Sequence, residues 1–223
     1  MINFEHKTLR EEAYDEIRSM ILSQEFPPGV EISIEELTEK LGVSHTPIRE
    51  ALNELNNEGL IEYNRRRKIS IPAVNRKIID DLFSIRKIFE PSLAADIAAN
   101  PPLRQLKKLK IEIELAFDSD YEEKYAKYFH TDRVMNSILI EEINNEIAKK
   151  ILKFLENYRL RIKLFLENSF RFSEKNIDTG NREHLKIIDC LIDKSPQRVE
   201  YALLDHLIAS EGRIMELLGV SKD

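Results

Sequence analysis

The chain has 223 residues, a formal net charge of −6 at pH 7 and 33% charged residues. This length suits one or two globular domains with a sizeable core. Nothing approaches the ~18 consecutive apolar residues of a membrane span, and the N-terminus is too acidic for a signal peptide. A lone cysteine, Cys190, excludes an internal disulfide framework, so we expect a cytoplasmic protein with no membrane partner. Common catalytic signatures (a phosphate-binding glycine loop, a CxxC pair, a GxSxG motif) are missing, which argues against an enzyme.

The first predicted element is a helix near the N-terminus. Its apolar residues recur at helical spacing: Leu9, Ala13, Ile17, Met20 and Ile21. The segment Phe26-Pro27-Pro28-Gly29 ends it. A short second helix should begin after Ser33, because Ser33 and Glu36 form a capping-box pattern, and it should end at Gly42.

A third helix follows this tight turn, with Thr46 as its predicted N-cap and Pro47 at its first helical position. One face is apolar and comprises Ile48, Ala51, Leu52 and Leu55. The residues at the start of this helix are the candidate DNA contacts: Ser44, His45, Thr46, Pro47 and Arg49. Two strand-like segments, 60–61 and 69–71, then flank a basic run of Arg65, Arg66, Arg67 and Lys68. This order predicts a winged helix-turn-helix domain over residues 1–74, which places one helix in the major groove of double-stranded DNA.

The charge of this domain needs an explanation, because residues 1–75 contain 9 Lys and Arg against 14 Asp and Glu. Most of the acids precede the third helix, whereas the cations cluster in the wing. Since local charge placement governs binding to phosphates, a single acidic module should bind DNA weakly. Two modules joined in a homodimer should bind well, with a strong dependence on salt.

Residues 75–223 predict helices throughout. Apolar stripes at helical spacing alternate with short breaks at 100–102 and 118–120, and the last two helices are separated by Ser195-Pro196. A first stripe includes Ile85 and Ile88, and residues 173–181 are expected to be a polar loop. The fold class is therefore mainly α, with a C-terminal antiparallel bundle of six or seven helices.

Three histidines in this half share helix faces with apolar residues: His130, His184 and His206. His184 and His206 flank the Ser195-Pro196 turn at nearly equal distances along their helices. Inward imidazoles at one level, with a third from another helix, suit a divalent metal. The simpler alternative is that each is a hydrogen-bonded core residue.

The segment GVSHTPIREALNELNNEGLIEY resembles the helix-turn-helix of the GntR family of bacterial transcription regulators. Residues 85–95 and 182–207 are similar to the FCD effector domain of the FadR-type branch of that family. The resemblance implies a homodimeric, ligand-responsive repressor on a palindromic operator, released by a small organic acid. Thr46 and Arg49 match the expected DNA contacts, whereas Glu35 and His45 stand where the family usually has Arg.

The resemblance also implies a metal held by three His and one Asp, with Asp and the first His in a D-x-x-F-H pattern. We place this pattern at residues 126–130, so that Ala126 stands in the position of the acid and His130, His184 and His206 match. Such a three-His site would bind zinc or nickel, with the effector carboxylate filling an open position. Glu122 or Glu123 is a possible substitute acid. Alternatively, the metal has been lost and the pocket survives as a hydrogen-bonding cavity.

Candidate effector contacts are Arg159 and Arg161, as a clamp on a second carboxylate, and Tyr128 as part of the lining. Two other functions stay open. The first is a helical metal-dependent hydrolase with a tethering N-terminal domain, although we find no acid at helical spacing beside the histidines to act as a base. The second is a small architectural DNA binder with an inactive bundle.

Overall fold

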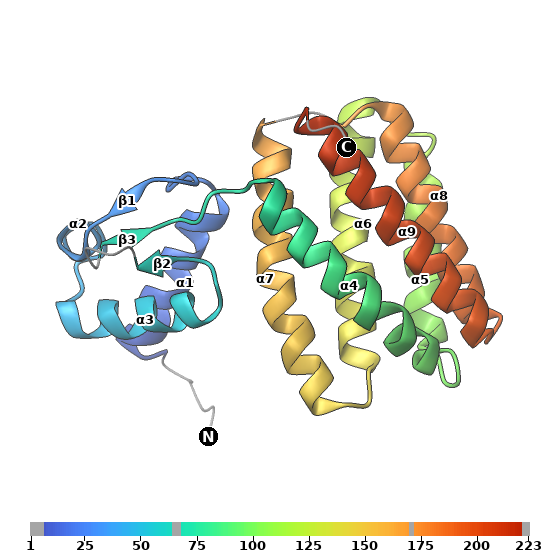
Figure 1. The fold of residues 1–223 in the computed structure, drawn as a ribbon, viewed down its shortest axis with the longest axis horizontal. Helices are drawn as coiled ribbons and strands as arrows, with labels where there is room; N and C mark the ends of the chain where they lie inside the picture. The colour runs from blue at the N-terminus through green and yellow to red at the C-terminus, as the bar shows by residue number, and fades with distance from the viewer. Residues whose placement is uncertain (1–6, 64–67, 170–171, 220–223) are drawn as a thin grey trace, which may run out of the picture. The chain divides into compact units, whose positions relative to one another are not determined.

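The structure, a computed structural model, describes residues 7–63, 68–169 and 172–219 (Figure 1). Its chain divides into two compact units, which are described separately below. Unit 1 comprises Met1–Asn75 together with Phe154–Ser169, and unit 2 comprises Arg76–Lys153 together with Phe170–Asp223. The sequence predicted a division after Val74, but it did not predict that residues 154–169 group with the first unit.

Three helices form the centre of unit 1: α1 (Leu9–Leu22), α2 (Ile34–Leu41) and α3 (His45–Asn57). Local sequence explains their ends. Thr8 and Glu11 form a reciprocal capping box before α1, and the Ser33 hydroxyl accepts a hydrogen bond from the Glu36 amide before α2. Gly42 follows α2 with φ of 65°, the left-handed conformation that glycine adopts without strain. These end signals confirm the predicted helix-turn-helix.

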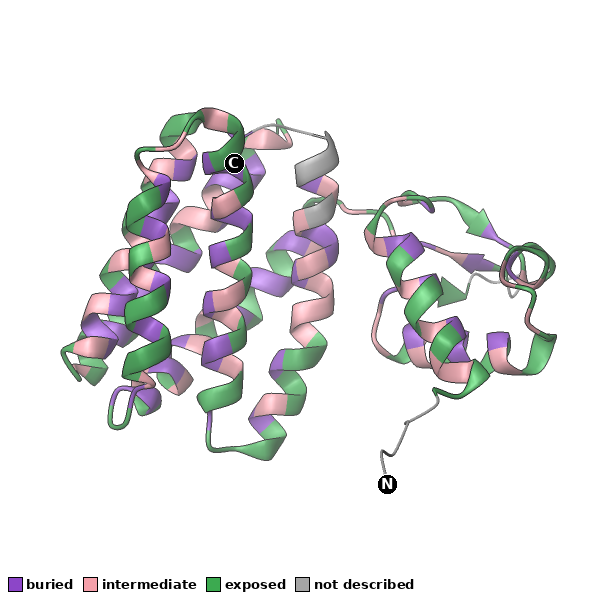
Figure 2. Ribbon diagram, turned by 180° about the vertical axis from the view of Figure 1, so that it is seen from behind, coloured by how far each residue is buried: buried purple, intermediate pink, exposed green. Residues whose placement is uncertain are grey.

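The third helix begins two residues earlier than predicted. Ser44, not Thr46, is the N-cap of α3, so the prediction for Thr46 was wrong. Pro47 then lies within the first turn, where a residue without an amide proton is tolerated because those amides have no helical acceptor. The buried residues of α3 belong to one apolar core with those of α1; they are Ile48, Ala51, Leu52 and Leu55. Figure 2 colours buried positions purple on the ribbon.

A small antiparallel sheet completes this core, in the order β1-β3-β2. Its strands are β1 (Glu31–Ile32), β2 (Glu62–Tyr63) and β3 (Ile69–Ser70), with Ile69 opposite both Ile32 and Tyr63. The predicted strand at 60–61 lies just before β2, where both residues are buried in the core instead. Strand β1 was not predicted, because two residues are too few to show an alternation of apolar and polar side chains.

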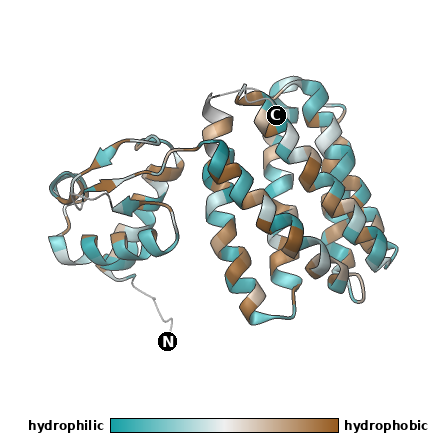
Figure 3. Cartoon of the chain, viewed as in Figure 1, coloured by the Kyte–Doolittle hydropathy of each residue, from teal (hydrophilic) through white to brown (hydrophobic). Residues whose placement is uncertain are grey.

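Six helices follow in the described part of the remaining chain. They are α4 (Arg76–Ile97), α5 (Leu103–Ala116), α6 (Tyr121–Glu142), α7 (Glu146–Ser169), α8 (Glu174–Ile192) and α9 (Pro196–Leu217). Within unit 2, α9 packs along both α4 and α8, and α6 packs against α5 and α8. Figure 3 shows that hydrophobic and hydrophilic residues alternate along these helices, as the predicted bundle requires. The mainly α fold class is confirmed.

One predicted loop is helical. Residues 174–181 belong to α8, which begins after the N-cap Ser173. Glycine inside a helix usually signals a break, but Gly180 has a packing role. A Cβ atom at this position would lie 2.7 Å from the ring of Tyr128 on α6. Gly180 therefore allows α8 to approach this aromatic ring closely.

Candidate functional site

The first candidate site is the exposed start of α3. Ser44, His45, Thr46 and Arg49 are exposed, and Pro47 is partly buried. The opposite side of the helix is fixed by fully buried Ile48 and Leu52. A rigid helix with a buried inner face and a polar outer N-terminus is the arrangement by which helix-turn-helix proteins read base edges.

Arg49 lies beside the wing rather than within a helical ion pair. Glu54, one alternative partner on the same helix, is paired with Arg10 of α1. Burial raises the pKa of the Tyr63 hydroxyl on β2, and the neighbouring charge of Arg49 opposes that rise. Arg49 is thus an exposed cation between the recognition helix and the first strand of the wing.

Only one of the four predicted wing cations lies in the described residues. Arg65, Arg66 and Arg67 lie outside them. Lys68 is exposed, and its Nζ lies 2.6 Å from Oε2 of Glu31 on β1. Exposed ion pairs of this kind contribute little stability, so Lys68 can exchange its carboxylate partner for a DNA phosphate at low cost.

The second candidate site is in unit 2, where three helices bring metal-binding side chains together. Asp132 of α6, His184 of α8 and His206 of α9 each offer a ligand atom, and these atoms all lie within 4.8 Å of one another. His184 Nε2 lies 3.6 Å from Oδ1 of Asp132, and the two imidazole rings are 4.8 Å apart between centroids. The prediction that His184 and His206 meet at one level of the hairpin is confirmed.

A buried polar network orients these side chains. Oε2 of Glu183 lies 2.8 Å from Nδ1 of His206, and Arg213 donates from both terminal nitrogens to the Glu183 carboxylate at 2.7 Å. Burial favours the neutral form of Glu183, but the hydrogen bonds from His206 and Arg213 outweigh it and lower its pKa to about 2. The ring of Tyr128 stacks on that of His184, with centroids 5.8 Å apart and planes 7° apart.

His130 is not part of this cluster. Its side chain is 60% exposed and lies 4.0 Å from Glu112, so the prediction that it points inward was wrong. On α6, His130 and Asp132 are two residues apart, which places them about 200° apart around the helix axis. The D-x-x-F-H spacing instead fits Asp132 to Asn136: the acid is present, Asn136 replaces the first histidine, and Ala126 has no role in the pattern.

The three residues predicted to contact the effector lie in different surroundings. Tyr128 is buried against His184, as expected for a residue lining this site. Arg159 pairs with Glu156, and Arg161 donates to the carbonyl oxygen of Gly59 at 2.6 Å in unit 1. These contacts do not support the clamp prediction, because both guanidinium groups already have protein partners.

Sequence reasoning missed four polar residues of this site: Asp132, Asn136, Glu183 and Arg213. Asp132 and Asn136 share one face of α6, where the Asn136 amide donates to the carbonyl oxygen of Asp132 at 2.7 Å. Arg213 follows His206 by seven residues, a spacing that returns to the same helix face. These spacings are visible in the sequence. They indicate a shared site only once the inward faces of α6, α8 and α9 are known.

The donor set fits a divalent transition metal. Two imidazoles and one carboxylate are common ligands for zinc and nickel, and such metals leave open positions for water or a ligand. The Glu183 contact with His206 also matches the outer carboxylate that usually orients a metal-binding imidazole. The residues present are thus consistent with a metal site.

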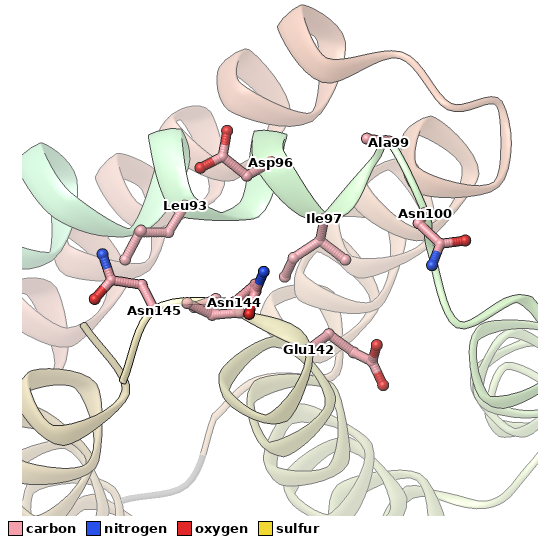
Figure 4. A pocket seen from close by; sticks show the side chains of 9 residues that line it. Leu93, Asp96, Ile97, Ala99, Asn100, Glu142, Asn144 and Asn145 are labelled. Atoms are coloured by element: carbon pink, nitrogen blue, oxygen red, sulfur yellow. The ribbon is translucent and has the colours of Figure 1, made fainter. Parts of the chain in front are cut away.

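A separate surface pocket lies between the end of α4 and the α6–α7 turn (Figure 4). Its volume is about 430 Å³, and Asp96, Asn100, Glu142, Asn144 and Asn145 are among its lining residues. These polar residues are all exposed, and none is a predicted site residue. The pocket therefore carries no functional argument.

The geometry defines a class of protein: a winged helix-turn-helix DNA-binding unit joined to a helical unit with a buried polar site. Residues 9–71 match the family described as bacterial regulatory proteins, gntR family, and residues 81–209 match the FCD domain. The FCD match alone covers more than half of the chain. The chain therefore belongs to the GntR family of regulators, in the branch that carries an FCD domain.

Relatives over most of the chain agree with this. The chain is 26% identical over 196 residues to the uncharacterized HTH-type transcriptional regulator YdhC of Bacillus subtilis, covering 86% of this chain and 85% of that protein. It is 26% identical to the HTH-type transcriptional repressor NanR of Enterobacter sp., covering 90% and 83%. The solved structure of E. coli McbR/YncC has the same fold, with a TM-score of 0.73 at 17% identity over 95% of this chain and 99% of that one.

The chain is accordingly a ligand-responsive DNA-binding transcription regulator and not an enzyme. The alternative of a metal-dependent hydrolase is not supported, because family and relatives alike are regulators. None of the helices that the structure describes is long and apolar enough to cross a membrane.

Proposed function

We propose that this regulator is a homodimeric repressor that leaves a palindromic operator when a small carboxylate binds at a metal in the FCD domain. The observation that carries the proposal is the convergence of Asp132, His184 and His206 from three helices. The three side chains would hold a zinc or nickel ion in place. The bound ion would then attract the carboxylate of the effector. Repression is supported by the NanR relative, which is named a repressor.

The DNA half of the proposal assigns Thr46 and Arg49 to base edges and Lys68 to the backbone. Thr46 and Arg49 are exposed on the first turns of α3, and Lys68 lies in the wing. Side chains at the start of a recognition helix contact bases, whereas wing cations contact phosphates without reading sequence. Arg65, Arg66 and Arg67 are assigned to phosphates on their charge alone.

Exposed apolar side chains support the homodimer. Ile85 and Ile88, which belong to the first apolar stripe of unit 2, are 47% and 77% exposed on α4. Ile147 and Ile151, one turn apart on α7, are also exposed. Exposed apolar side chains that share a helix face commonly mark an interface, and two-fold symmetry would place two reading helices on two half-sites.

The proposal is tested with the purified full-length chain. Elemental analysis should find zinc or nickel, native mass spectrometry should give twice the chain mass, and DNA fragments selected from a random library should contain a palindrome. Adding carboxylates to the protein–DNA complex at fixed salt should release DNA for at least one compound. A metal-free monomer whose DNA affinity no carboxylate changes would contradict the proposal.

A further inference from the structure

Asn181 is a buried polar residue that the DNA-binding and metal-binding assignments leave without a role. It lies on α8 with 0% exposure, three residues before His184, which is also 0% exposed. Residues three apart on a helix lie on the same face. Asn181 therefore occupies the inner face of α8, about 4.5 Å along the helix axis from His184.

The side-chain amide of Asn181 is unsatisfied on both sides. Within residues 7–63, 68–169 and 172–219, neither its Nδ2 nor its Oδ1 has a hydrogen-bond partner. A buried donor or acceptor left unpaired costs about 1–3 kcal/mol, so proteins rarely retain such groups without a use. Close packing of the adjacent Gly180 against Tyr128, the ring that stacks on His184, keeps this segment of α8 next to the site.

We propose that Asn181 is a specificity residue of the effector site and binds a neutral group that both donates and accepts hydrogen bonds. This inference rests on the proposed metal-dependent effector site. A second carboxylate would satisfy only the Asn181 N–H groups, because an ionised carboxylate donates nothing. A hydroxyl satisfies both sides of the amide. The effector is accordingly a small hydroxycarboxylic acid, with its carboxylate at the metal and a hydroxyl a few atoms away at Asn181.

The test compares acids that differ by one hydroxyl. Full-length protein loaded with zinc is titrated with 3-hydroxybutyrate against butyrate and with malate against succinate, by calorimetry and by thermal shift. The wild type should bind the hydroxylated member of at least one pair about fivefold to a hundredfold more tightly, the range expected for two hydrogen bonds. Asn181→Leu should bind both members of that pair equally, while its zinc affinity stays unchanged.

Asn176→Leu is the matched control, because it makes the same substitution on α8 at a partly exposed position and should keep the hydroxyl preference. NMR of the wild type gives a second measurement that needs no variant. The Asn181 side-chain amide signals should shift with the preferred hydroxy acid and stay in place with its deoxy partner.

The outcomes separate this inference from the function on which it rests. A wild type that binds no zinc contradicts the proposed metal site and the role of Asn181 together. Zinc binding without preference in either pair, or a preference that survives Asn181→Leu, overturns only the role of Asn181, since the hydroxyl would then act at the metal.

Discussion

Arg161 of α7 donates a hydrogen bond from Nη1 to the backbone carbonyl oxygen of Gly59 at 2.6 Å. Gly59 lies two residues after the end of α3, so this bond joins the second half of α7 to the end of the recognition helix within unit 1. The Arg161 guanidinium also lies over the ring of Tyr158, 5.1 Å from its centroid. Burial lowers the pKa of Arg161, and the hydrogen bond offsets part of the cost of burying this cation.

Replacing Arg161 should destabilise unit 1. Arg161→Ala leaves a carbonyl group without its charged donor, and a hydrogen bond to a charged group contributes about 1.5–3 kcal/mol. We expect a loss of this size in the free energy of unfolding, measured by urea denaturation. Arg133→Ala, at an exposed position on α6, should change stability by less than about 0.5 kcal/mol. Equal effects of the two variants would show that the Gly59 contact contributes nothing specific.

Gly59 should tolerate no side chain, for two independent reasons. Its φ is 73°, and a Cβ atom there would lie 2.5 Å from the hydroxyl oxygen of Tyr158. Gly42 is a matched control, with φ of 65° and nothing within 4 Å of an added Cβ. Gly42→Ala should cost only the left-handed strain of about 1–2 kcal/mol, whereas Gly59→Ala should cost more in the same unfolding experiment. In a Tyr158→Ala background the two glycine substitutions should cost the same.

Arg49→Ala should lower operator affinity by about 1–3 kcal/mol if Arg49 contacts a base edge. The measurement is fluorescence anisotropy with a selected operator and a scrambled duplex at one salt concentration. The loss should be larger on the operator, because a base contact carries sequence information. Asn57→Ala, exposed at the far end of α3, should leave both affinities unchanged. Equal losses on both duplexes would make Arg49 a phosphate contact.

Metal binding should depend on the cluster and not on His130. His184→Gln or His206→Gln should abolish zinc retention and the thermal stabilisation that zinc gives, since each removes one of three ligands. His130→Gln should retain both, because His130 is exposed on the other side of α6. Loss of zinc binding in His130→Gln would instead show that His130 is a metal ligand, as predicted from the sequence.

The sequence predicted well where local chemistry decides the structure. Ser33 and Gly42 set the ends of α2, and the apolar face of α3 could be read from its spacing. The level of His184 and His206 followed from counting along two antiparallel helices. These inferences needed only the geometry of single helices and one turn.

The errors arose where packing between elements decides. His130 was predicted to bind the metal because it follows Phe129 in the expected pattern. The orientation of α6 against α8 instead places Asp132 beside His184. Arg161 was expected to contact an effector. Its hydrogen bond to Gly59, just after α3, could not be predicted because no local sequence pattern indicates it. Asn181 was assigned to a loop, since a glycine beside an asparagine normally breaks a helix, and only the Tyr128 ring explains Gly180.

Gly180→Ala should disturb the effector site without touching a metal ligand. An added methyl group would lie 2.7 Å from the Tyr128 ring, and forcing extra volume into a packed core costs about 1–3 kcal/mol. Gly212 of α9 is the control, because nothing lies within 4 Å of an added Cβ there. Gly212→Ala should stabilise the protein by about 0.5–1 kcal/mol, since alanine is more favourable than glycine in a helix interior.

Because the Tyr128 ring stacks on His184, Gly180→Ala should also weaken zinc binding in calorimetry, whereas Gly212→Ala should not. A Gly180→Ala protein with wild-type stability and zinc affinity would mean that the ring moves aside freely and does not orient His184.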